Sequence, residues 1–365
     1  EVFDRLRMPV RVVDEDRVEV EVPGYRVDVE REVDLIEEIV RVQGYERVGS
    51  SLPAARQPGG LPAGYAFIGR VRRSLVRAGL REVRQVPFVS DTDLALFGDP
   101  GAVPVTNPLQ ADEGYLRPRM APGLLKALRR NLNRHVRGAA LFEIGAVFRS
   151  GGKDVREERA AGFVLAGRAS QGWAEPERSF DVFDGKGVVE AVLADLGVRG
   201  WALGDPPGDP FHPGRSAEVR IGPQVVGAFG ELHPRAAASL DLAGRVTVGE
   251  LDLEALMGRA GSELAVLDLP RFPPVRRDLA FMVAEDTPAG GVQAALEEAA
   301  GDLLGGCVLF DVHQGPPLPE GRKSLAFSVD LRAQDRTLTA AEADAAVAQI
   351  VERLGRDLGA ELRAG

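Results

Sequence analysis

The pattern of apolar and polar residues at the start of the chain predicts a strand followed by a helix. Residues 18–22 alternate valine with glutamate, which is typical of a strand with one buried face. Apolar residues then recur at α-helical spacing over residues 31–43, and Gly44 follows as a helix end. The apolar stripe, which we expect to face a core, consists of Val33, Ile36, Ile39 and Val40. The stretch from Gly49 to Gly64 is rich in glycine, proline and serine and predicts a linker.

The middle of the chain, from about residue 63 to residue 264, carries more strand signals than helix signals. Two stretches with apolar residues at helical spacing predict helices, and the first of them ends at Gly79. Dense apolar runs at residues 141–148, 163–165 and 219–229 predict strands, with glycine and proline between them as in hairpins. We therefore expect a mostly antiparallel sheet with flanking helices.

The pattern from residue 270 to the end predicts the order β-α-β-β-α-β, which is a ferredoxin-like arrangement. Thr339 and Glu342 have the spacing of a capping box and mark the start of the second helix. Strands are expected at residues 279–283, 307–312, 324–331 and 361–362. The predicted fold class of the whole chain is therefore α+β.

Charge and composition exclude several functional classes. The 365-residue chain has 45 basic and 55 acidic side chains and a net charge of −10, which disfavours nucleic-acid binding by the whole surface but permits a local basic patch. Cys307 is the only cysteine, so an internal disulfide and a cysteine-rich zinc site are excluded. Neither a membrane-spanning run of about 20 apolar residues nor a signal peptide is visible, and we expect a cytoplasmic protein without a membrane partner. Because the chain starts at Glu1, inside a structural unit, we expect a fragment.

Four carboxylates near the first predicted helix are candidate metal ligands. Asp34, Glu37 and Glu38 lie at positions i, i+3 and i+4 on the face opposite the apolar stripe, and Asp28 lies just before the helix. Ligands that offer only oxygen suit a hard cation such as Mg²⁺. The other interpretation is a solvated acidic face of an amphipathic helix, which the spacing alone favours.

Common catalytic motifs are missing from the sequence. It contains neither a Gly-x-x-x-x-Gly-Lys-Ser/Thr loop nor a Gly-x-Ser-x-Gly elbow. Its four histidines are scattered, and none pairs with another at the spacing of zinc ligands. These absences disfavour nucleotide hydrolysis by a phosphate-binding loop, serine hydrolase chemistry and a zinc centre.

A set of short segments, taken together, points to one known family. They are residues 25–39, 43–45, 107–109, 116–117, 122–125, 141–145, 212–217, 227–234, 272–279, 309–312, 323–327 and 336–339. Each segment is a modest match by itself, but the ordered set extends over nearly the whole chain. It resembles the β subunit of bacterial phenylalanyl-tRNA synthetase.

The resemblance implies three domains. They are a partial winged-helix-like domain at residues 1–51, a class II synthetase catalytic-like domain at 60–265 and a ferredoxin-like anticodon-binding domain at 270–365. The family's β chain is longer and also carries an oligonucleotide-binding tRNA module and a domain that hydrolyses mischarged tyrosyl-tRNA. Neither of these is visible in this sequence, so no editing activity is expected of it.

The resemblance also changes the interpretation of the acidic helix. In the family, magnesium is bound by the carboxylates of this helix. The matching positions are Asp28, Asp34, Glu37 and Glu38. The resemblance therefore implies a Mg²⁺ cofactor at these residues in place of a solvated acidic face.

The middle domain resembles a class II catalytic core that has lost its catalytic residues. Residues 142–149 resemble the second class II motif, in which an arginine, here Arg149, grips the α-phosphate of ATP. Active enzymes have a glutamate two positions later, where this chain has Gly151, and the third motif has no counterpart beyond a weak likeness at Arg215. Phosphoryl chemistry needs several positioned cations, so we expect a non-catalytic scaffold. Arg149 is equally well explained as an ordinary surface arginine at a strand end.

The last domain resembles an anticodon-binding domain. Sheet faces of this topology stack unpaired bases, and basic side chains at their edges contact phosphates. The candidates for tRNA contacts are Arg276, Arg277, Lys323 and Arg336. For each of them, a solvated surface charge is at least as good an interpretation.

The main hypothesis is therefore a non-catalytic β-subunit part of phenylalanine–tRNA ligase, inactive as an isolated chain. The resemblance implies an assembly of two α and two β subunits, in which the α subunit binds ATP and phenylalanine and the β subunit supports it and binds tRNA(Phe). One alternative is a freestanding RNA-binding protein derived from the synthetase β subunit. Another is an autonomous class II-like ligase, which Gly151 and the missing third motif disfavour.

Overall fold

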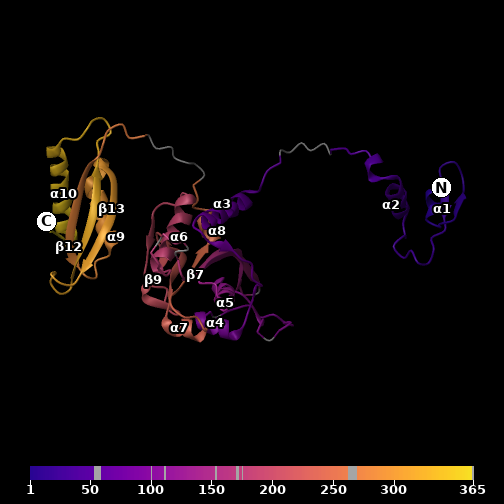
Figure 1. The fold of residues 1–365 in the computed structure, drawn as a ribbon, viewed down its shortest axis with the longest axis horizontal. Coiled ribbons are helices and arrows are strands. Elements are labelled where there is room, and N and C mark those ends of the chain that lie inside the picture. The colour runs from indigo at the N-terminus through magenta and orange to yellow at the C-terminus, as the bar shows by residue number, and fades with distance from the viewer. Residues whose placement is uncertain are drawn as a thin grey trace. The chain divides into compact units, whose positions relative to one another are not determined.

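A computed structural model describes residues 1–52, 59–99, 101–110, 112–152, 154–169, 172–174, 176–261 and 269–363 of the chain. The chain divides into two compact units, one that ends at Gly261 and one that follows it (Figure 1). The linker predicted from Gly49 to Gly64 lies partly outside the described residues, and so does the domain end predicted at residue 265.

The first fifty residues form a two-stranded sheet and one long helix. Their elements are α1 (Val2–Arg5), β1 (Val10–Val12), β2 (Val18–Val20), α2 (Glu32–Gln43) and the 3₁₀ helix η1 (Tyr45–Arg47). The strands are antiparallel, with Val10 opposite Val20. The helix predicted over residues 31–43 is confirmed to within one residue, and it ends at Gly44, whose φ of 103° favours glycine.

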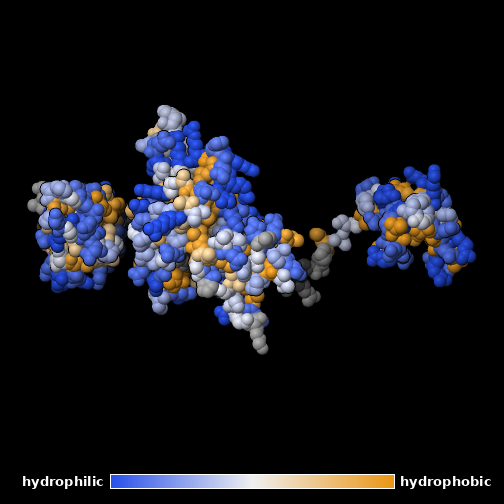
Figure 2. Space-filling view, turned by 90° about the horizontal axis from the view of Figure 1, so that it is seen from below, coloured by the Kyte–Doolittle hydropathy of each residue, from blue (hydrophilic) through white to orange (hydrophobic). Residues whose placement is uncertain are grey.

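The expectation that the apolar stripe of α2 faces a core holds only in part, since Ile39 and Val40 are half-buried. Val33 and Ile36 are 54% and 50% exposed, and the buried residue of the helix is Glu38, which we expected on the solvent side. Figure 2 accordingly shows apolar surface, in orange, on this part of the chain. Glu38 is buried because two arginines compensate its charge, which residue spacing along the helix does not reveal.

The middle part is built on a seven-stranded sheet. The strands, in spatial order, are β3 (Arg81–Glu82), β6 (Gly138–Ser150), β7 (Val155–Gly167), β11 (Val246–Asp252), β10 (Gln224–Leu232), β9 (Phe211–Ile221) and β8 (Trp201–Leu203). Every neighbouring pair is antiparallel except β3 and β6. The mostly antiparallel sheet expected from the sequence is thus confirmed. A separate pair, β4 (Phe88–Val89) and β5 (Tyr115–Leu116), lies outside this sheet.

Helices cover both faces of the seven-stranded sheet. One face, with Phe142 and Phe163, packs against α3 (Ala63–Arg77), α6 (Val182–Asp195) and α8 (Leu253–Met257). The other face, with Leu141 and Val164, packs against α4 (Asp91–Phe97), α5 (Ala121–Leu132) and α7 (Pro234–Ser239). Because side chains alternate along a strand, neighbouring residues of β6 enter different cores.

The second unit has the ferredoxin-like topology. Its elements are β12 (Val275–Ala284), α9 (Ala289–Ala300), η2 (Gly301–Leu303), β13 (Leu304–Gln314), β14 (Arg322–Leu331), α10 (Ala340–Leu358) and β15 (Glu361–Leu362). The strands form one antiparallel sheet in the order β13-β14-β12-β15. Both helices pack on one face of it, around Phe281 and Phe327. The predicted capping box is present, since the Thr339 side chain accepts from the Glu342 backbone and Glu342 accepts from that of Thr339.

Within the described residues, no helix combines the length and the apolar character that a membrane-spanning helix requires.

Candidate functional site

The four carboxylates predicted to bind a metal lie near one another but are held by arginines and backbone groups. Arg26 Nη2 donates to Asp28 Oδ2 at 2.6 Å and to Glu38 Oε1 at 2.7 Å. One nitrogen atom therefore bridges two of the four predicted ligands. Hydrogen bonds from Arg26 hold the pKa of the Asp28 carboxyl at about 2, below its ordinary value of 3.8.

The two other carboxylates have different roles. Asp34 Oδ2 accepts from the backbone N–H groups of Glu30 at 3.0 Å and Arg31 at 2.7 Å, so it caps the start of α2. Glu37 is exposed on the same helix. Within the described part of the chain, no group of three or more carboxylate, histidine or cysteine side chains is arranged to hold a metal ion.

The four carboxylates suit a hard cation by their chemistry, but they are not arranged around a common point. All four side chains offer carboxylate oxygen, which Mg²⁺ prefers at about 2.0–2.1 Å in octahedral geometry. A cation bound to both Asp28 and Glu38 would take the position that Arg26 Nη2 now holds. The four residues therefore do not form a cation cage in this structure.

Glu38 makes the N-terminal part sensitive to acid. Hydrogen bonds from Arg26 and then Arg41 lower the pKa of the Glu38 carboxyl from 4.5 to about 2. Because the folded-state pKa is depressed, this contribution to stability is complete above about pH 4.5 and is lost as the pH falls towards 2.

We expect Glu38→Gln to flatten this pH profile. The variant loses two charge-assisted hydrogen bonds and should be less stable at pH 7 by about 1.5–3 kcal/mol, with a smaller further loss on acidification. Amide hydrogen exchange of α2 between pH 7 and pH 3 measures both effects. The control Glu37→Gln, on the exposed face, should keep the wild-type profile, and an unchanged profile in Glu38→Gln would contradict the assignment.

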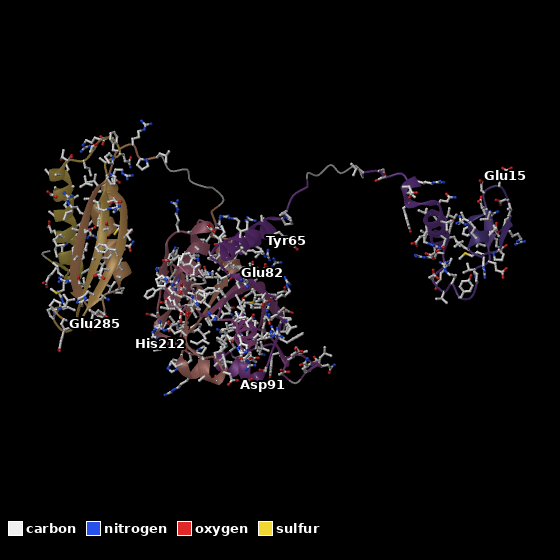
Figure 3. All side chains as sticks on the ribbon, in the orientation of Figure 1. Glu15, Tyr65, Glu82, Asp91, His212 and Glu285 are labelled. Atoms are coloured by element: carbon white, nitrogen blue, oxygen red, sulfur yellow. The ribbon has the colours of Figure 1, made fainter. Side chains whose placement is uncertain are left out.

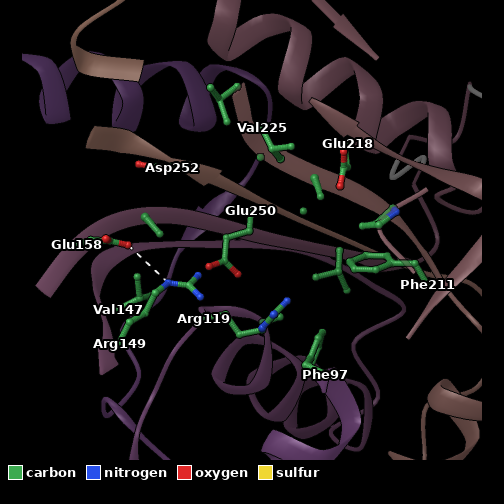
Figure 4. Close-up of a pocket in the computed structure, with 18 of the residues that line it drawn as sticks. Phe97, Arg119, Val147, Arg149, Glu158, Phe211, Glu218, Val225, Glu250 and Asp252 are labelled. Atoms are coloured by element: carbon green, nitrogen blue, oxygen red, sulfur yellow. Dashed lines mark ion pairs between the residues drawn. The ribbon is translucent and has the colours of Figure 1, made fainter. Parts of the chain in front are cut away.

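The middle part contains a cavity of about 360 Å³ on the α5 side of its sheet (Figure 4). Strands β6, β7, β9, β10 and β11 form its floor, and the start of α5 and the end of α4 form a wall. Its charged lining residues are Arg119, Arg149, Arg159, Glu158, Asp209, Glu218, Glu250 and Asp252. Carboxylates outnumber guanidinium groups in this lining.

Arg149, the arginine that resembles the ATP-gripping residue, lies in this cavity. Its Nε atom is 3.5 Å from Glu158 Oε2, and about half of its side chain is exposed. Arg119 is fixed nearby, because it pairs with Asp99 and lies over the ring of Phe97, 5.0 Å from the centroid. A surplus of carboxylates repels a triphosphate, so the lining disfavours ATP binding.

Arg215, the weak likeness to the third class II motif, does not line the cavity. Its Nη1 donates at 2.9 Å to Glu231 Oε2, a carboxylate that is only 3% exposed as a residue. Arg215 therefore neutralises a buried carboxylate near the end of β10, which is a structural role.

Sequence reasoning missed Glu250 and Arg119 as parts of this cavity. Glu250 belongs to β11, and its Oε2 accepts from the backbone N–H of Met120 at 3.1 Å. Desolvation by burial raises the pKa of the Glu250 carboxyl, against the opposing effects of Arg119 and Arg149. No motif in the sequence surrounds Glu250, and only the pairing of distant strands brings it near Arg149.

The four candidate tRNA-binding residues of the second unit do not share one surface. Arg276 lies on the sheet face opposite the helices, where it forms two hydrogen bonds with Asp330 at 2.7 and 2.9 Å. Arg277 points to the helix side and donates to Asp344 of α10 at 3.0 Å. Lys323, near the start of β14, lies two residues before the core residue Leu325 and therefore on the helix side of the sheet, and Arg336 is held by Asp335 and Glu342 before α10.

In the second unit, the sheet face away from the helices, which we call the open face, has small side chains at its centre and larger ones at its edge. Ala280, Ala326 and Ser328 lie on the face away from the helices, because their neighbours along each strand are core residues. Val308 and Phe310 of the edge strand β13 are 61% and 57% exposed. Such a face is accessible to flat aromatic ligands such as nucleobases.

Three family models match the chain in succession. Residues 1–45 match the tRNA synthetase B5 domain, residues 48–253 the phenylalanyl tRNA synthetase beta chain CLM domain and residues 270–363 the ferredoxin-fold anticodon binding domain. Together these matches leave only short stretches of the chain uncovered.

Curated relatives are similar over the length of this chain. The phenylalanine–tRNA ligase beta subunit of Moorella thermoacetica is 39% identical over 375 aligned positions, which cover 100% of this chain and 46% of the relative. That of Symbiobacterium thermophilum is 41% identical over 355 positions, which cover 94% and 39%. The chain thus spans less than half the length of these relatives.

Among solved structures, pyrrolysyl-tRNA synthetase from Desulfitobacterium hafniense aligns with a TM-score of 0.44 and 16% sequence identity. The alignment covers 67% of this chain and 87% of that chain. This likeness is too weak to carry an argument.

Proposed function

Because this chain belongs to the phenylalanyl-tRNA synthetase β-chain family, we propose that it acts as part of the β subunit of phenylalanine–tRNA ligase. In this proposal it supports a catalytic α subunit, which binds ATP and phenylalanine, and it binds tRNA(Phe) while phenylalanine is attached. The assembly has two α and two β subunits and is cytoplasmic. The chain itself contributes a winged-helix-like domain at residues 1–51, a catalytic-like domain at 60–265 and an anticodon-binding domain at 270–365.

One observation carries the assignment of a supporting, non-catalytic role. The cavity around Arg149 is lined by more carboxylates than guanidinium groups, and Gly151 stands where active enzymes have a glutamate. A site that transfers an adenylyl group must stabilise the charge of the phosphates with positioned cations. This lining does the opposite, so we expect no ATP–pyrophosphate exchange by the isolated chain.

The outer face of α3 supports an interface with a second protein. Tyr65 and Val76 lie three helical turns apart on one face and are 63% and 54% exposed, and Figure 3 labels Tyr65 on this helix. An exposed aromatic anchor is the kind of residue that dominates binding energy at protein interfaces. We propose that this face packs against the α subunit.

Co-expression with an α subunit tests the main proposal. The wild-type chain should co-purify with it, and the complex, unlike the chain alone, should perform ATP–pyrophosphate exchange. Tyr65→Asp with Val76→Asp should abolish co-purification, whereas Leu203→Asp, at an exposed position of β8, should leave it intact. A folded wild-type chain that fails to co-purify would overturn the proposal. The freestanding RNA-binding alternative gains no support from the comparisons.

We also propose that Asp28, Asp34, Glu37 and Glu38 bind Mg²⁺ in the assembled enzyme. The oxygen-only donor set supports this, but Arg26 must leave its position between Asp28 and Glu38 first. Calorimetric titration of the complex and of the isolated chain with Mg²⁺ tests this assignment. Glu38→Gln should remove binding and Glu32→Gln, an exposed position of α2, should not. Equal Mg²⁺ binding by wild type and Glu38→Gln would refute the assignment.

We propose that tRNA binds to the open face of the sheet in the second unit, with Arg276 at the rim of this face. Arg276 is the one of the four candidates that shares this face with Val308, and Phe310 is exposed at the irregular position of the same edge strand. Arg277, Lys323 and Arg336 would contact phosphates only from the helix side or from the loop before α10. RNA contact on this surface must be local because residues 270–365 carry a net negative charge.

We expect Phe310→Ala to weaken binding of an anticodon stem-loop RNA by about 1–3 kcal/mol, because stacking of a base on an aromatic ring contributes that much. Filter binding at fixed low salt measures it. Val312→Ala is the matched control. Val312 is 52% exposed on the same strand, but it is paired in register with the core residue Leu325, so its side chain lies on the helix side of the sheet. Equal losses in both variants would contradict stacking on the open face.

A further inference from the structure

The cavity around Arg149 has no use in the proposed function, yet it contains an incompletely paired carboxylate. In register across the sheet, Glu143 of β6, Glu250 of β11 and Glu218 of β9 lie in one row, joined by Gly162 and Ala228. Glu250, Ala228 and Glu218 of this row line the cavity, and Glu143 lies beyond its edge. Three carboxylates on one sheet face require cationic partners.

Two of these three carboxylates have such partners. Arg117 donates to Glu143 at 2.9 Å, and Arg220 donates to Glu218 at 2.9 Å. Among the described residues, Glu250 receives a hydrogen bond only from the Met120 backbone, because Arg119 directs its hydrogen bonds to Asp99. Burial accordingly raises the pKa of the Glu250 carboxyl. A bound ammonium group would pair with the Glu250 carboxylate and stabilise its ionised form.

Arg149 provides the opposite charge at the same cavity. Its guanidinium faces the Glu250 carboxylate in Figure 4, and its contact with Glu158 is long, with Nε 3.5 Å from Oε2. The planar guanidinium is suited to bidentate binding of a carboxylate. The cavity thus presents an acceptor for an ammonium group and a donor for a carboxylate.

Apolar side chains line the remainder of the cavity. Phe97, Val147, Phe211, Val226 and Val248 contribute to the lining, and each is at most 8% exposed. A volume of about 360 Å³ is within the range of small-molecule pockets. The walls therefore suit an apolar group of a few carbon atoms attached to the two charges.

We propose that this cavity binds a small zwitterion, an α-amino acid with an apolar side chain, whose ammonium group pairs with Glu250 and whose carboxylate pairs with Arg149. A zwitterion adds no net charge to a lining that is already acidic, unlike a nucleotide. The site lies in this chain and does not depend on the α subunit or on tRNA. It gives the β chain a means to sense an amino acid.

Calorimetric titration of the full chain with L-leucine, L-phenylalanine and two leucine analogues tests the proposal. 3-Methylbutan-1-amine lacks the carboxylate, and 4-methylpentanoate lacks the ammonium group. Each analogue should bind at least about tenfold more weakly than L-leucine, because each loses one charge-assisted pair. The α subunit is absent from the titration, so failure of this proposal is distinct from failure of co-purification.

Two variants and two controls connect binding to the named residues. Glu250→Gln and Arg149→Met should each weaken L-leucine binding about tenfold or more, with circular dichroism and melting temperature confirming the fold. Arg156→Met, opposite Arg149 on β7 but outside the cavity, should bind as wild type, and so should Glu157→Gln. No saturable binding of either amino acid up to about 10 mM, binding of an analogue as tight as L-leucine, or unchanged binding in both variants would overturn the proposal.

Discussion

Replacing Arg117 by methionine is expected to destabilise the middle part of the chain by about 3–5 kcal/mol. Arg117 and Glu143 form an ion pair at 2.9 Å in which both side chains are almost fully buried. Arg117 Nε also donates to the Ala146 carbonyl at 2.9 Å. Without the guanidinium, Glu143 remains a buried carboxylate, and its Oε2 already has no hydrogen-bond partner among the described residues.

The matched control for this variant removes both charges. Arg117→Met with Glu143→Leu replaces the pair by apolar groups of similar size, and such replacements of buried pairs are often neutral or stabilising. Denaturant unfolding followed by circular dichroism compares the two variants. If the double variant is as unstable as Arg117→Met, the loss comes from the packing of Arg117, and the electrostatic explanation fails.

Replacing Phe327 by alanine is expected to remove a large part of the stability of the second unit. Phe327 lies at the centre of β14, is fully buried and is opposite Leu279 and Leu309 on the two neighbouring strands. Truncation of a buried phenylalanine costs about 3–5 kcal/mol. A domain of this size has a total stability of about 5–15 kcal/mol, so the loss is a large part of the whole.

Calorimetry should locate this loss in one unit. Because the chain divides into two compact units, we expect the transition of the second unit to shift down by at least about 12 °C while that of the first remains in place. Phe310→Ala, which truncates an exposed phenylalanine of the same unit, is the control and should shift it little. Equal shifts in both transitions would contradict independent folding of the units.

The elements of the second unit were predictable because their signals are local. The capping box of Thr339 and Glu342 fixes the start of α10, and the alternating pattern of residues 324–331 falls within β14. The pairing of β12 with β14 follows from the order of elements and the rules of connection. The same reasoning predicted parts of strands in the middle sheet, such as residues 141–148 in β6 and 163–165 in β7, but it left the turn between β9 and β10 and the lining of the cavity unassigned.

Local signals failed where one charged side chain changes the environment of another. The helical spacing around Glu38 predicts a solvated carboxylate, but Arg26, twelve residues earlier, and Arg41 pair with it and allow its burial. Spacing along one helix contains no information about a loop arginine that folds back onto it. The Mg²⁺ assignment at this helix depends on the same contact and stays a proposal.

The sequence by itself determined the α+β class, the element order of the ferredoxin-like unit and the resemblance to a synthetase β subunit. Periodicity, caps and short ordered motifs are properties of neighbouring residues, so they are readable without a structure. Only the tertiary structure decided which charges meet, Arg26 with Glu38 and Arg117 with Glu143, and it placed Arg149 and Glu250 in the lining of one cavity. These contacts join residues that are far apart in the chain, and their energies depend on burial, which only the packed sheet and helices create.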